Sequence, residues 1–271
     1  MDLTKTFGLP VSLEGADYRL KFGEGIEPED RSSKYLQQVI GLLYKPDAAL
    51  GKDELSYSFC PGIYKEEHKT LFKSRDYANG ITVLMPVTND ATGGECRKNS
   101  GHYHGITEGH TLPYPEAYEI LTGKAVFLLQ KSTNFHIDEE VAVDEMFAVF
   151  LEPGEKLIVP PYYAHCAINI GEGPMAFGNL AAPSPLFYEP IQKKHGFGYY
   201  VLKINGHVVF VPNARYRNLP QLKIAKAQEN KDMGISFDTP LYTAFINEPE
   251  RFDYLSNPEK YELQIDALLL K

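Results

Sequence analysis

The segment "GHYHGITEGHTLPYPEAYEILTG", residues 101–123, contains three of the eight histidines of the chain within nine residues, and a carboxylate follows them in an apolar run. On a strand, side chains two residues apart point to the same face, so His102 and His104 face together, as do Glu116 and Tyr118. A His-x-His pair is weak evidence alone, because about 0.2 such pairs are expected by chance in this chain. The segment therefore predicts two strands whose inner faces carry groups that can bind a metal.

Short apolar runs separated by turn residues extend on both sides of this segment, over residues 78–216. They read "GITVLMPV", "KAVFLLQ", "MFAVFLEPGEKLIVPP", "CAINIG" and "GYYVLKINGHVVFVP". In the last of these, Asn205 and Gly206 are a strong signal for a two-residue hairpin. The pattern predicts a mainly β core for residues 78–216.

The region before this core contains a helix-like pattern. The stretch "EDRSSKYLQQVIGLLYKPD", residues 29–47, predicts a helix that stops before Pro46. Its apolar face consists of Leu36, Val39, Ile40 and Leu43. We therefore expect an N-terminal extension over residues 1–77, made of a helix with loops and strands that pack on the core.

After Tyr216 the sequence again favours helices, which predicts a C-terminal helical extension over residues 217–271. In "SNPEKYELQIDALLLK", residues 256–271, Asn257 is the expected N-cap and Pro258 the first helical residue. The apolar stripe of this helix is Leu263, Ile265, Leu268 and Leu270. So much apolar surface predicts that these helices pack on the outside of the core or on a second subunit.

Composition and charge exclude several classes of protein. The chain has 271 residues with 43% hydrophobic content, enough to bury a large core, and a formal net charge of −9. No basic stripe is present that could follow a nucleic acid, and no apolar run or basic leader indicates a membrane or secretion. The cysteines, Cys60, Cys96 and Cys166, are odd in number and far apart, which favours free thiols and a cytoplasmic protein.

A fourth histidine stands in "GEKLIVPPYYAHCAIN", residues 154–169, where Gly154, Pro160, His165 and Asn169 have a regular spacing. Together with residues 101–123, this segment resembles the two conserved patterns of the cupin family, Gly-x5-His-x-His-x3,4-Glu-x6-Gly and Gly-x5-Pro-x-Gly-x2-His-x3-Asn. The resemblance implies a jelly-roll β-barrel. Two positions depart from the patterns: eleven residues separate His104 from Glu116, and Tyr162 replaces a glycine.

The long gap leaves two carboxylates for the metal. Glu108 has the shorter spacing from His104, but Glu116 has Gly123 at the expected distance and lies in a strand-like run, so we prefer Glu116. His110 lies in the same loop as Glu108 and is expected to face solvent or substrate. The remaining histidines have no partner at ligand spacing and are expected on the surface or in the core; they are His68, His136, His195 and His207.

The set His102, His104, Glu116 and His165 offers three imidazoles and one carboxylate to one divalent transition metal per chain. Such a set leaves open positions on the metal and suits iron, manganese, nickel or zinc. Iron is our first expectation.

A closer resemblance rests on "GHYH", "PEAYEILTGKAVFLLQ", "LEPG", "VPPYYAHCAINIG" and "GITVLMP". These segments are similar to those of the cupin-type phosphoglucose isomerases of archaea and some bacteria. The resemblance implies a homodimer that binds a metal and interconverts glucose 6-phosphate and fructose 6-phosphate, in glycolysis and gluconeogenesis.

Isomerisation needs a group that moves a proton between neighbouring carbons, or a direct hydride shift, and stabilisation of negative charge on the sugar oxygens. Glu116 is the expected proton carrier and Tyr118 a hydrogen-bond partner of the sugar. The resemblance places Thr82, Ser100 and the backbone of Gly101 near the phosphate.

Two aromatic residues complete the expected substrate contacts, Tyr162 and Tyr188. The relatives have a lysine where Ser100 stands, and a histidine near Leu186 or Phe187. Arg97 and Lys98 are close in sequence, but the pattern around them is typical of a solvated loop.

Two other classes of function remain open from the sequence. One is a different metal-dependent cupin enzyme, such as an oxygenase, decarboxylase or epimerase. The other is a sugar-binding cupin without turnover, whose helical extensions dock a partner. Glu116 and Tyr118 favour turnover, and "PPYYAH" favours the isomerase.

Overall fold

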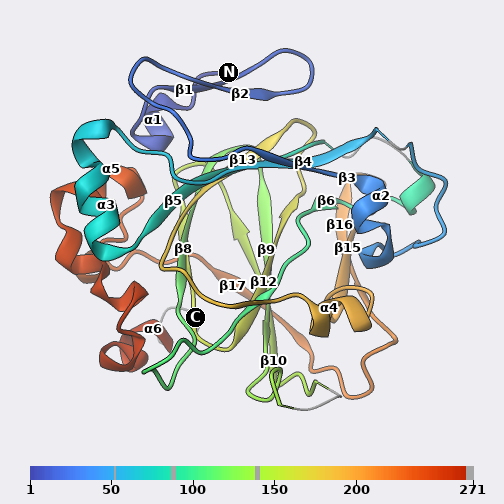
Figure 1. The fold of residues 1–271 in the computed structure, drawn as a ribbon. Coiled ribbons are helices and arrows are strands. Elements are labelled where there is room, and N and C mark those ends of the chain that lie inside the picture. Colours follow the sequence, from blue (N-terminus) through green and yellow to red (C-terminus); the bar gives the residue numbers. More distant parts are fainter. Residues whose placement is uncertain (52, 87–89, 138–140, 267–271) are drawn as a thin grey trace.

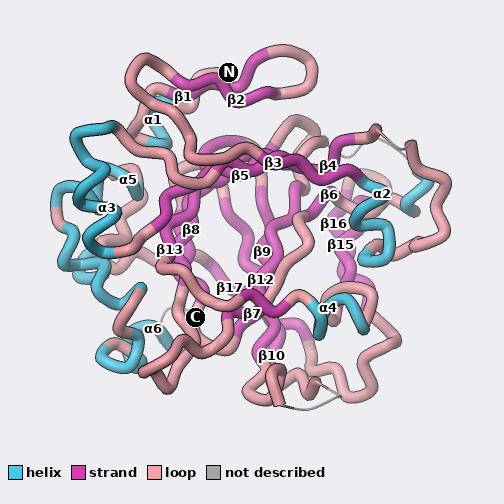
Figure 2. The backbone as a smooth tube through the Cα atoms, viewed as in Figure 1, coloured by secondary structure: helices cyan, strands magenta, loops and turns pink. Residues whose placement is uncertain are grey.

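The computed structural model describes residues 1–51, 53–86, 90–137 and 141–266 and contains two main β-sheets (Figures 1 and 2). One sheet has five strands in the order β17-β10-β9-β12-β6, and the other has six in the order β11-β8-β13-β5-β4-β3. The predicted mainly β fold with helical extensions is confirmed, and the two sheets enclose the jelly-roll core.

The strands of the five-stranded sheet are β6 (Arg97–Lys98), β9 (Ala125–Lys131), β10 (Glu145–Leu151), β12 (Tyr163–Asn169) and β17 (Leu222–Lys226). Those of the six-stranded sheet are β3 (Ser32–Tyr35), β4 (Leu55–Cys60), β5 (Ala78–Leu84), β8 (Glu116–Thr122), β11 (Lys156–Val159) and β13 (Met175–Ala181). Three two-stranded ribbons are formed by β1 (Val11–Glu14) with β2 (Arg19–Phe22), β7 (Tyr103–His104) with β14 (Leu186–Phe187), and β15 (Tyr199–Ile204) with β16 (His207–Pro212).

The helices are short and lie outside the sheets. The α-helices are α1 (Thr4–Phe7), α2 (Leu36–Val39), α3 (Lys69–Arg75), α4 (Glu189–Lys193), α5 (Leu241–Asn247) and α6 (Glu262–Asp266). The 3-10 helices are η1 (Ile40–Leu42), η2 (Glu66–His68), η3 (Asp90–Thr92), η4 (Lys231–Met233), η5 (Pro249–Leu255) and η6 (Pro258–Lys260). In Figure 1, α3, α5 and α6 gather on one side of the barrel, and α2 and α4 lie on the other. No helix in these described ranges is both long enough and apolar enough to cross a membrane.

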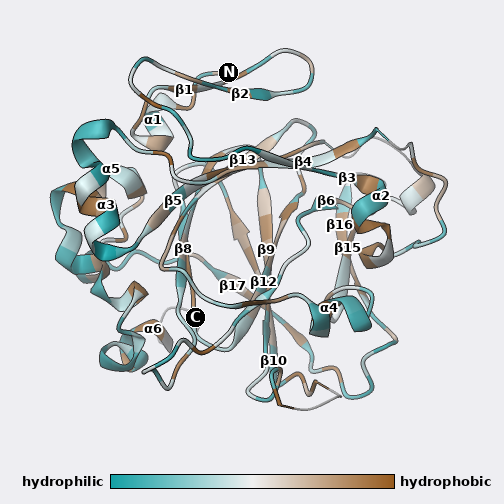
Figure 3. Ribbon diagram, in the orientation of Figure 1, coloured by the Kyte–Doolittle hydropathy of each residue, from teal (hydrophilic) through white to brown (hydrophobic). Residues whose placement is uncertain are grey.

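The central strands are buried on both faces, which explains their continuous apolar sequence. In β9, Phe127 and Leu129 belong to the core between the two sheets, whereas Val126 and Leu128 belong to a second core on the outer face. A third core lies on the outer face of the six-stranded sheet, beneath the C-terminal helices. Figure 3 shows these central strands as the hydrophobic centre of the molecule.

The hairpin expected at residues 205–206 is confirmed. Asn205 and Gly206 join β15 to β16 with φ angles of 51° and 80°, as a two-residue turn that matches the strand twist requires.

Two helical expectations were wrong in part. Residues 32–35, inside the first predicted helix, form strand β3 against β4, and the helix that follows has only the four residues of α2 before η1. Residues 222–226, expected to be helical, form β17 in parallel pairing with β10. Pairing with a distant strand overrode the local preference in both places. The sheets therefore extend beyond residues 78–216 on both sides.

The C-terminal extension covers the outer face of the six-stranded sheet. Phe245, Phe252, Tyr254 and Leu255 are fully buried in that core. Beneath them, the Nζ atom of Lys156 lies 2.8 Å from Oε1 of Glu119, whose other oxygen accepts a hydrogen bond of 2.7 Å from the amide of Leu241. The expectation that these helices pack on the barrel is confirmed.

The last predicted helix differs in its details. Asn257 precedes η6 and Pro258 is its first residue, but the side chain of Asn257 donates to Asp253 Oδ1 at 2.9 Å and does not cap the helix. Within α6, Ile265 is buried and Leu263 is exposed. Leu268 and Leu270 lie outside the described residues.

Candidate metal centre and active site

The structure brings together the four side chains His102, His104, Glu116 and His165. One ligand atom from each lies within 4.8 Å of all the others. His104 lies on β7, Glu116 begins β8 and His165 lies in β12, while His102 forms an isolated antiparallel bridge with His165. The cluster therefore joins the two sheets, with Glu116 as its carboxylate. Glu108 is exposed in the connecting loop and belongs to no such group among the described residues.

Glu116 is at the centre of the cluster. Its Oε2 atom lies 3.2 Å from His104 Nε2 and 3.3 Å from His165 Nε2. Its Oε1 atom accepts a hydrogen bond of 2.8 Å from Asn179 Nδ2 on the neighbouring strand β13. Asn179 thus fixes one carboxylate oxygen and leaves the other facing the imidazoles. The only hint of Asn179 in the sequence is one amide in the apolar run "MAFGNLA".

A backbone carbonyl sets the tautomer of His104. Its Nδ1 atom lies 2.8 Å from the carbonyl oxygen of Tyr114, and because a carbonyl only accepts, Nδ1 carries the proton and donates it. In the neutral ring, Nε2 of His104 is then the nitrogen that can bind a metal beside Glu116. An outer hydrogen bond of this kind is typical of histidines that bind metals.

The residues fit a bound metal. His165 is 1% exposed, and both of its ring nitrogens lack a hydrogen-bond partner among the described residues. Buried polar atoms normally have partners, so such an orphan next to a carboxylate indicates that a ligand completes the site. Burial, together with the neighbouring His165 and His104, holds the pKa of His102 well below its usual value, which favours the neutral imidazole that metals bind.

Glu116 is ionised in this setting. Burial favours the protonated carboxyl, but the imidazoles of His104 and His165 outweigh it and hold the pKa of Glu116 well below its usual value. Burial and the nearby charge of Glu116 raise the pKa of Tyr118 well above its usual value, so its hydroxyl keeps its proton. One carboxylate base, Glu116, and one hydrogen-bond donor, Tyr118, thus lie side by side.

The cluster opens into a cavity of about 400 Å³. Five residues expected at the substrate line it, namely Thr82, Ser100, Gly101, Tyr118 and Tyr188. The ring of Tyr188 lies over His102, with 5.2 Å between the ring centroids. Leu186, which stands where the relatives were expected to have a histidine, lines the cavity too.

Tyr162 is not among the described residues that line this cavity, so its contact with substrate stays a prediction. Its hydroxyl donates to the carbonyl oxygen of Thr111 at 3.3 Å. Its backbone φ is 68°, a left-handed conformation that glycine adopts at little cost. The turn explains why the cupin pattern has glycine here, and it directs the Tyr162 side chain to the outer loop.

Position 101 requires glycine for two reasons, its φ of 67° and the close contacts around it. A Cβ atom at this position would lie 2.7 Å from the carbonyl oxygen of His165 and 2.4 Å from Cε2 of Phe197. Glycine therefore lets the segment that carries His102 approach β12 closely enough to form the cluster.

Lys34 brings a positive charge to the cavity that the sequence did not indicate. On β3, Ser32 and Lys34 both line the cavity, as expected for residues two apart, and Lys34 pairs across the sheet with Tyr57. The Tyr57 hydroxyl lies 3.2 Å from Ser100 Oγ. The sequence predicted a helix for this segment, and residues two apart do not share a face on a helix. The prediction therefore did not place Ser32 and Lys34 together.

Arg97 and Lys98 were expected to form a solvated pair, and this was wrong. Arg97 is 6% exposed and pairs with Glu54. Lys98 pairs with the buried carboxylate of Glu95. Both residues form strand β6. Their charged groups are paired with these carboxylates, whereas in a solvated loop water would have contacted them.

The other histidines lie away from the cluster. His68 Nδ1 lies 2.6 Å from the Tyr242 hydroxyl, and His110 Nδ1 lies 3.3 Å from Glu259 Oε2. His207 is exposed on the hairpin. His195 borders a neighbouring cavity of about 510 Å³ that shares several residues with the first, namely Lys34, Tyr57, Ser100 and Tyr188.

Comparison of the sequence with known proteins gives a consistent result. Residues 34–217 match the sequence model of the family described as glucose-6-phosphate isomerase. The glucose-6-phosphate isomerase of Thermococcus litoralis is 34% identical over 201 residues, which cover 73% of this chain and 95% of that protein. That of Thermococcus gammatolerans is 32% identical over 221 residues, 80% of this chain and 99% of that protein. An oxalate oxidase in complex with glycolate aligns at 12% identity with a TM-score of 0.31, over 43% of this chain and 47% of that one.

Proposed function

Because the chain belongs to the glucose-6-phosphate isomerase family, we propose that it interconverts glucose 6-phosphate and fructose 6-phosphate. The observation that carries the proposal is the cluster of three imidazoles and Glu116 at one end of a cavity lined by Tyr118. A cavity of about 400 Å³ is of the size that small-molecule ligands occupy.

We propose that His102, His104, Glu116 and His165 hold one divalent transition metal. Iron is the first expectation, and manganese, nickel and zinc suit the same donor set. When bound, such a metal supplies a Lewis acid that stabilises negative charge on the sugar oxygens O1 and O2.

Glu116 is the proposed proton carrier. In the direction from glucose 6-phosphate, the C2–H bond breaks, its proton goes to a Glu116 oxygen, and its electron pair forms the C1–C2 double bond of an enediol. As the electrons of the C1 carbonyl move to O1, that oxygen takes up the proton that O2 gives up. The proton on Glu116 then returns to C1 and the carbonyl forms at C2, so atoms and charge balance. Tyr118, protonated beside Glu116, donates a hydrogen bond to a sugar oxygen during the transfer. In a direct hydride shift the hydrogen of C2 would move to C1 with its electron pair. A deuterium placed at C2 would then stay in the sugar and would not exchange with solvent.

The phosphate end is proposed to lie near Thr82, Ser100, the backbone of Gly101 and Tyr188, with Lys34 as its cation. Lys34 stands across β3 and β4 from Tyr57, whose hydroxyl contacts Ser100. A lysine in this place compensates for the missing lysine at position 100.

We expect Lys34→Gln to raise the KM for fructose 6-phosphate about 10-fold and to change kcat by less than about threefold, because a charged hydrogen bond to the phosphate is made equally in the ground state and the transition state. Steady-state rates with the metal-loaded protein measure both constants. Lys226→Gln, on an exposed position of β17, is the matched control and should match the parent. An unchanged KM in Lys34→Gln contradicts the assignment of Lys34.

A homodimer in the cytoplasm is proposed for the assembly and location. Phe150 on β10 and Ile224 on β17 are exposed apolar residues on the same face of the sheet, since Ala148 pairs with Ile224. A second copy would cover such a face. The buried free thiols of Cys60, Cys96 and Cys166 suit a reducing compartment.

The test of the proposed function is a coupled assay that follows glucose 6-phosphate formation from fructose 6-phosphate by the metal-reconstituted protein. A metal-dependent rate supports the isomerase. No rate above background with iron, manganese, nickel or zinc overturns it. Formation of mannose 6-phosphate in place of glucose 6-phosphate would identify a different product specificity.

A further inference from the structure

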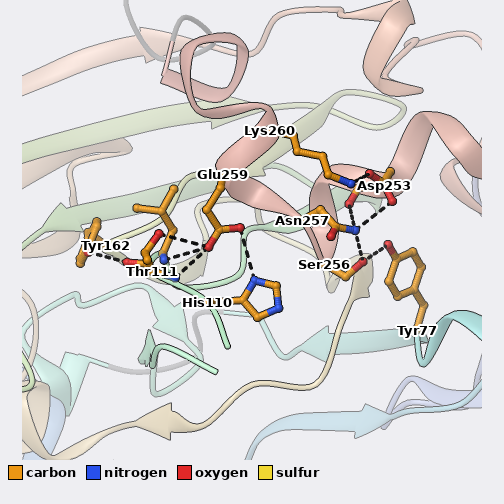
Figure 4. A network of polar contacts seen from close by, with 10 residues as sticks. Tyr77, His110, Thr111, Tyr162, Asp253, Ser256, Asn257, Glu259 and Lys260 are labelled. Carbon is orange, nitrogen blue, oxygen red and sulfur yellow. Dashed lines mark hydrogen bonds and ion pairs between the residues drawn. The ribbon is translucent and has the colours of Figure 1, made fainter. Parts of the chain in front are cut away.

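The loop between His104 and Glu116 is held from outside by one carboxylate of the C-terminal extension (Figure 4). Glu259 Oε1 accepts hydrogen bonds from the amide of Thr111 at 2.8 Å and the amide of Leu112 at 3.2 Å. Glu259 Oε2 lies 3.3 Å from His110 Nδ1. The eleven-residue loop, residues 105–115, is therefore fixed at its middle by a residue far away in sequence.

Three further contacts hold the turn that carries Glu259. It lies in η6, and Asn257 just before it donates from Nδ2 to Asp253 Oδ1 at 2.9 Å. Lys260 Nζ lies 3.5 Å from Asp253 Oδ2. The hydroxyl of Tyr77, the residue before β5, lies 2.9 Å from Ser256 Oγ. The contact of Tyr77 joins the turn to the segment that leads into β5 of the six-stranded sheet, and Figure 4 shows all three contacts beside the loop.

The C-terminal part of the loop contacts His104, one of the proposed metal ligands. Tyr114, two residues after Leu112, provides the carbonyl oxygen that accepts from His104 Nδ1 at 2.8 Å. The His110 ring packs edge-on against the Tyr114 ring, with 4.9 Å between the centroids. Glu259 thus contacts residues immediately before the one carbonyl that orients His104.

The carboxylate of Glu259 is ionised at neutral pH. Partial burial opposes ionisation, but hydrogen bonds from the Thr111 amide and from its own backbone amide, and to a smaller extent from His110 and Leu112, lower the pKa of Glu259 to about 2. Each of these bonds is therefore charge-assisted, which makes it stronger than a neutral one.

We propose that Glu259 is a positioning residue of the metal centre. By holding Thr111 and Leu112 it keeps the Tyr114 carbonyl on His104 Nδ1, and this directs His104 Nε2 at the metal. The C-terminal extension thereby sets the affinity of the site for its metal. The inference rests on the metal centre proposed above and does not depend on which sugar phosphate the cavity takes.

Three measurements on the full chain test this role in Glu259→Ala. Hydrogen exchange should be at least about 10-fold faster at the Thr111 and Leu112 amides, since their charged acceptor is gone. The affinity for Mn²⁺, followed by electron paramagnetic resonance of the free ion, should fall about 10-fold, the lower end of the effect of outer hydrogen-bond partners of metal ligands. The kcat for isomerisation should fall at saturating fructose 6-phosphate, while KM stays within about twofold.

Two further variants sharpen the result. Glu259→Gln keeps an oxygen that accepts from both amides, so its Mn²⁺ affinity should lie between those of Glu259→Ala and the parent; it also carries the test if Glu259→Ala does not fold. Glu262→Ala, an exposed carboxylate three residues further on, is the matched control and should equal the parent.

Faster exchange in Glu259→Ala with unchanged Mn²⁺ affinity would show that the contact only orders the loop and would overturn the proposal. Unchanged exchange at both amides would overturn it as well. If the parent itself shows no isomerase activity, the proposed reaction fails, whereas exchange and Mn²⁺ affinity still decide the role of Glu259.

Discussion

Glu116→Gln should lower turnover of fructose 6-phosphate by a factor of about 10² to 10⁴ and reduce metal content only modestly. The amide keeps an oxygen that can bind the metal weakly, but it cannot accept the proton that leaves the sugar. Glu116 Oε1 accepts from Asn179 Nδ2 at 2.8 Å, and Oε2 faces the imidazoles. The amide oxygen can bind the metal when it takes the place of Oε2, and the amide NH2 group then faces Asn179, whose Oδ1 can turn to accept from it. Initial rates and metal analysis on the same preparations measure the two effects separately.

Glu108→Gln is the matched control for this prediction. Glu108 is exposed in the loop, so its substitution should leave both metal content and turnover close to those of the parent. Glu116→Ala should lose more metal than Glu116→Gln. If Glu108→Gln loses the metal and Glu116→Gln does not, the carboxylate ligand has been assigned to the wrong residue.

His165→Ala should remove the metal and bring isomerase activity to background. His165 is 1% exposed and carries the imidazole whose two nitrogens have no other partner among the described residues. Binding that occurs only in the folded state stabilises by about 4.1 kcal/mol at a ligand concentration of 1,000 Kd. For a chain of this size that corresponds to roughly 10 °C in Tm. The parent should therefore melt about that much higher with metal than after chelation, whereas His165→Ala should show almost no difference.

The control for this prediction is the parent after verified metal removal, followed by metal addition. Recovery of both Tm and activity shows that chelation did no other damage. A metal-dependent rise in the Tm of His165→Ala equal to that of the parent would mean that the metal binds elsewhere.

The four residues of the cluster could be predicted from the sequence because their spacing and their phase on the strands agreed. His102 and His104 share a face by the period of a strand, and Gly123 at the end of β8 placed Glu116 rather than Glu108 on the inner face. The hairpin at Asn205 and Gly206 could also be predicted from neighbouring residues, because the positive φ angles of these two residues define its turn. Features fixed by a few neighbouring residues can be predicted in this way.

The rest of the site depends on contacts between distant segments. Lys34 reaches the cavity because residues 32–35 pair with β4, although their sequence favoured a helix. Asn179 is aligned with Glu116 by the neighbouring strand, and Glu259 meets the loop through the fold of the C-terminal extension. Tyr162 has a positive φ, at a position where the cupin pattern has glycine, and its hydroxyl contacts the carbonyl oxygen of Thr111, which the sequence did not indicate.

The most direct test of the account is a titration of the metal-stripped protein with Mn²⁺, in which the rate of glucose 6-phosphate formation from fructose 6-phosphate is measured at each addition. The account predicts a rate near background without metal, a linear rise, and a break at one equivalent per chain, because the cluster of His102, His104, Glu116 and His165 holds one ion. A full rate in verified metal-free protein, or no rate at any Mn²⁺ concentration while one equivalent is bound, would contradict the claim that this cluster supports the isomerisation.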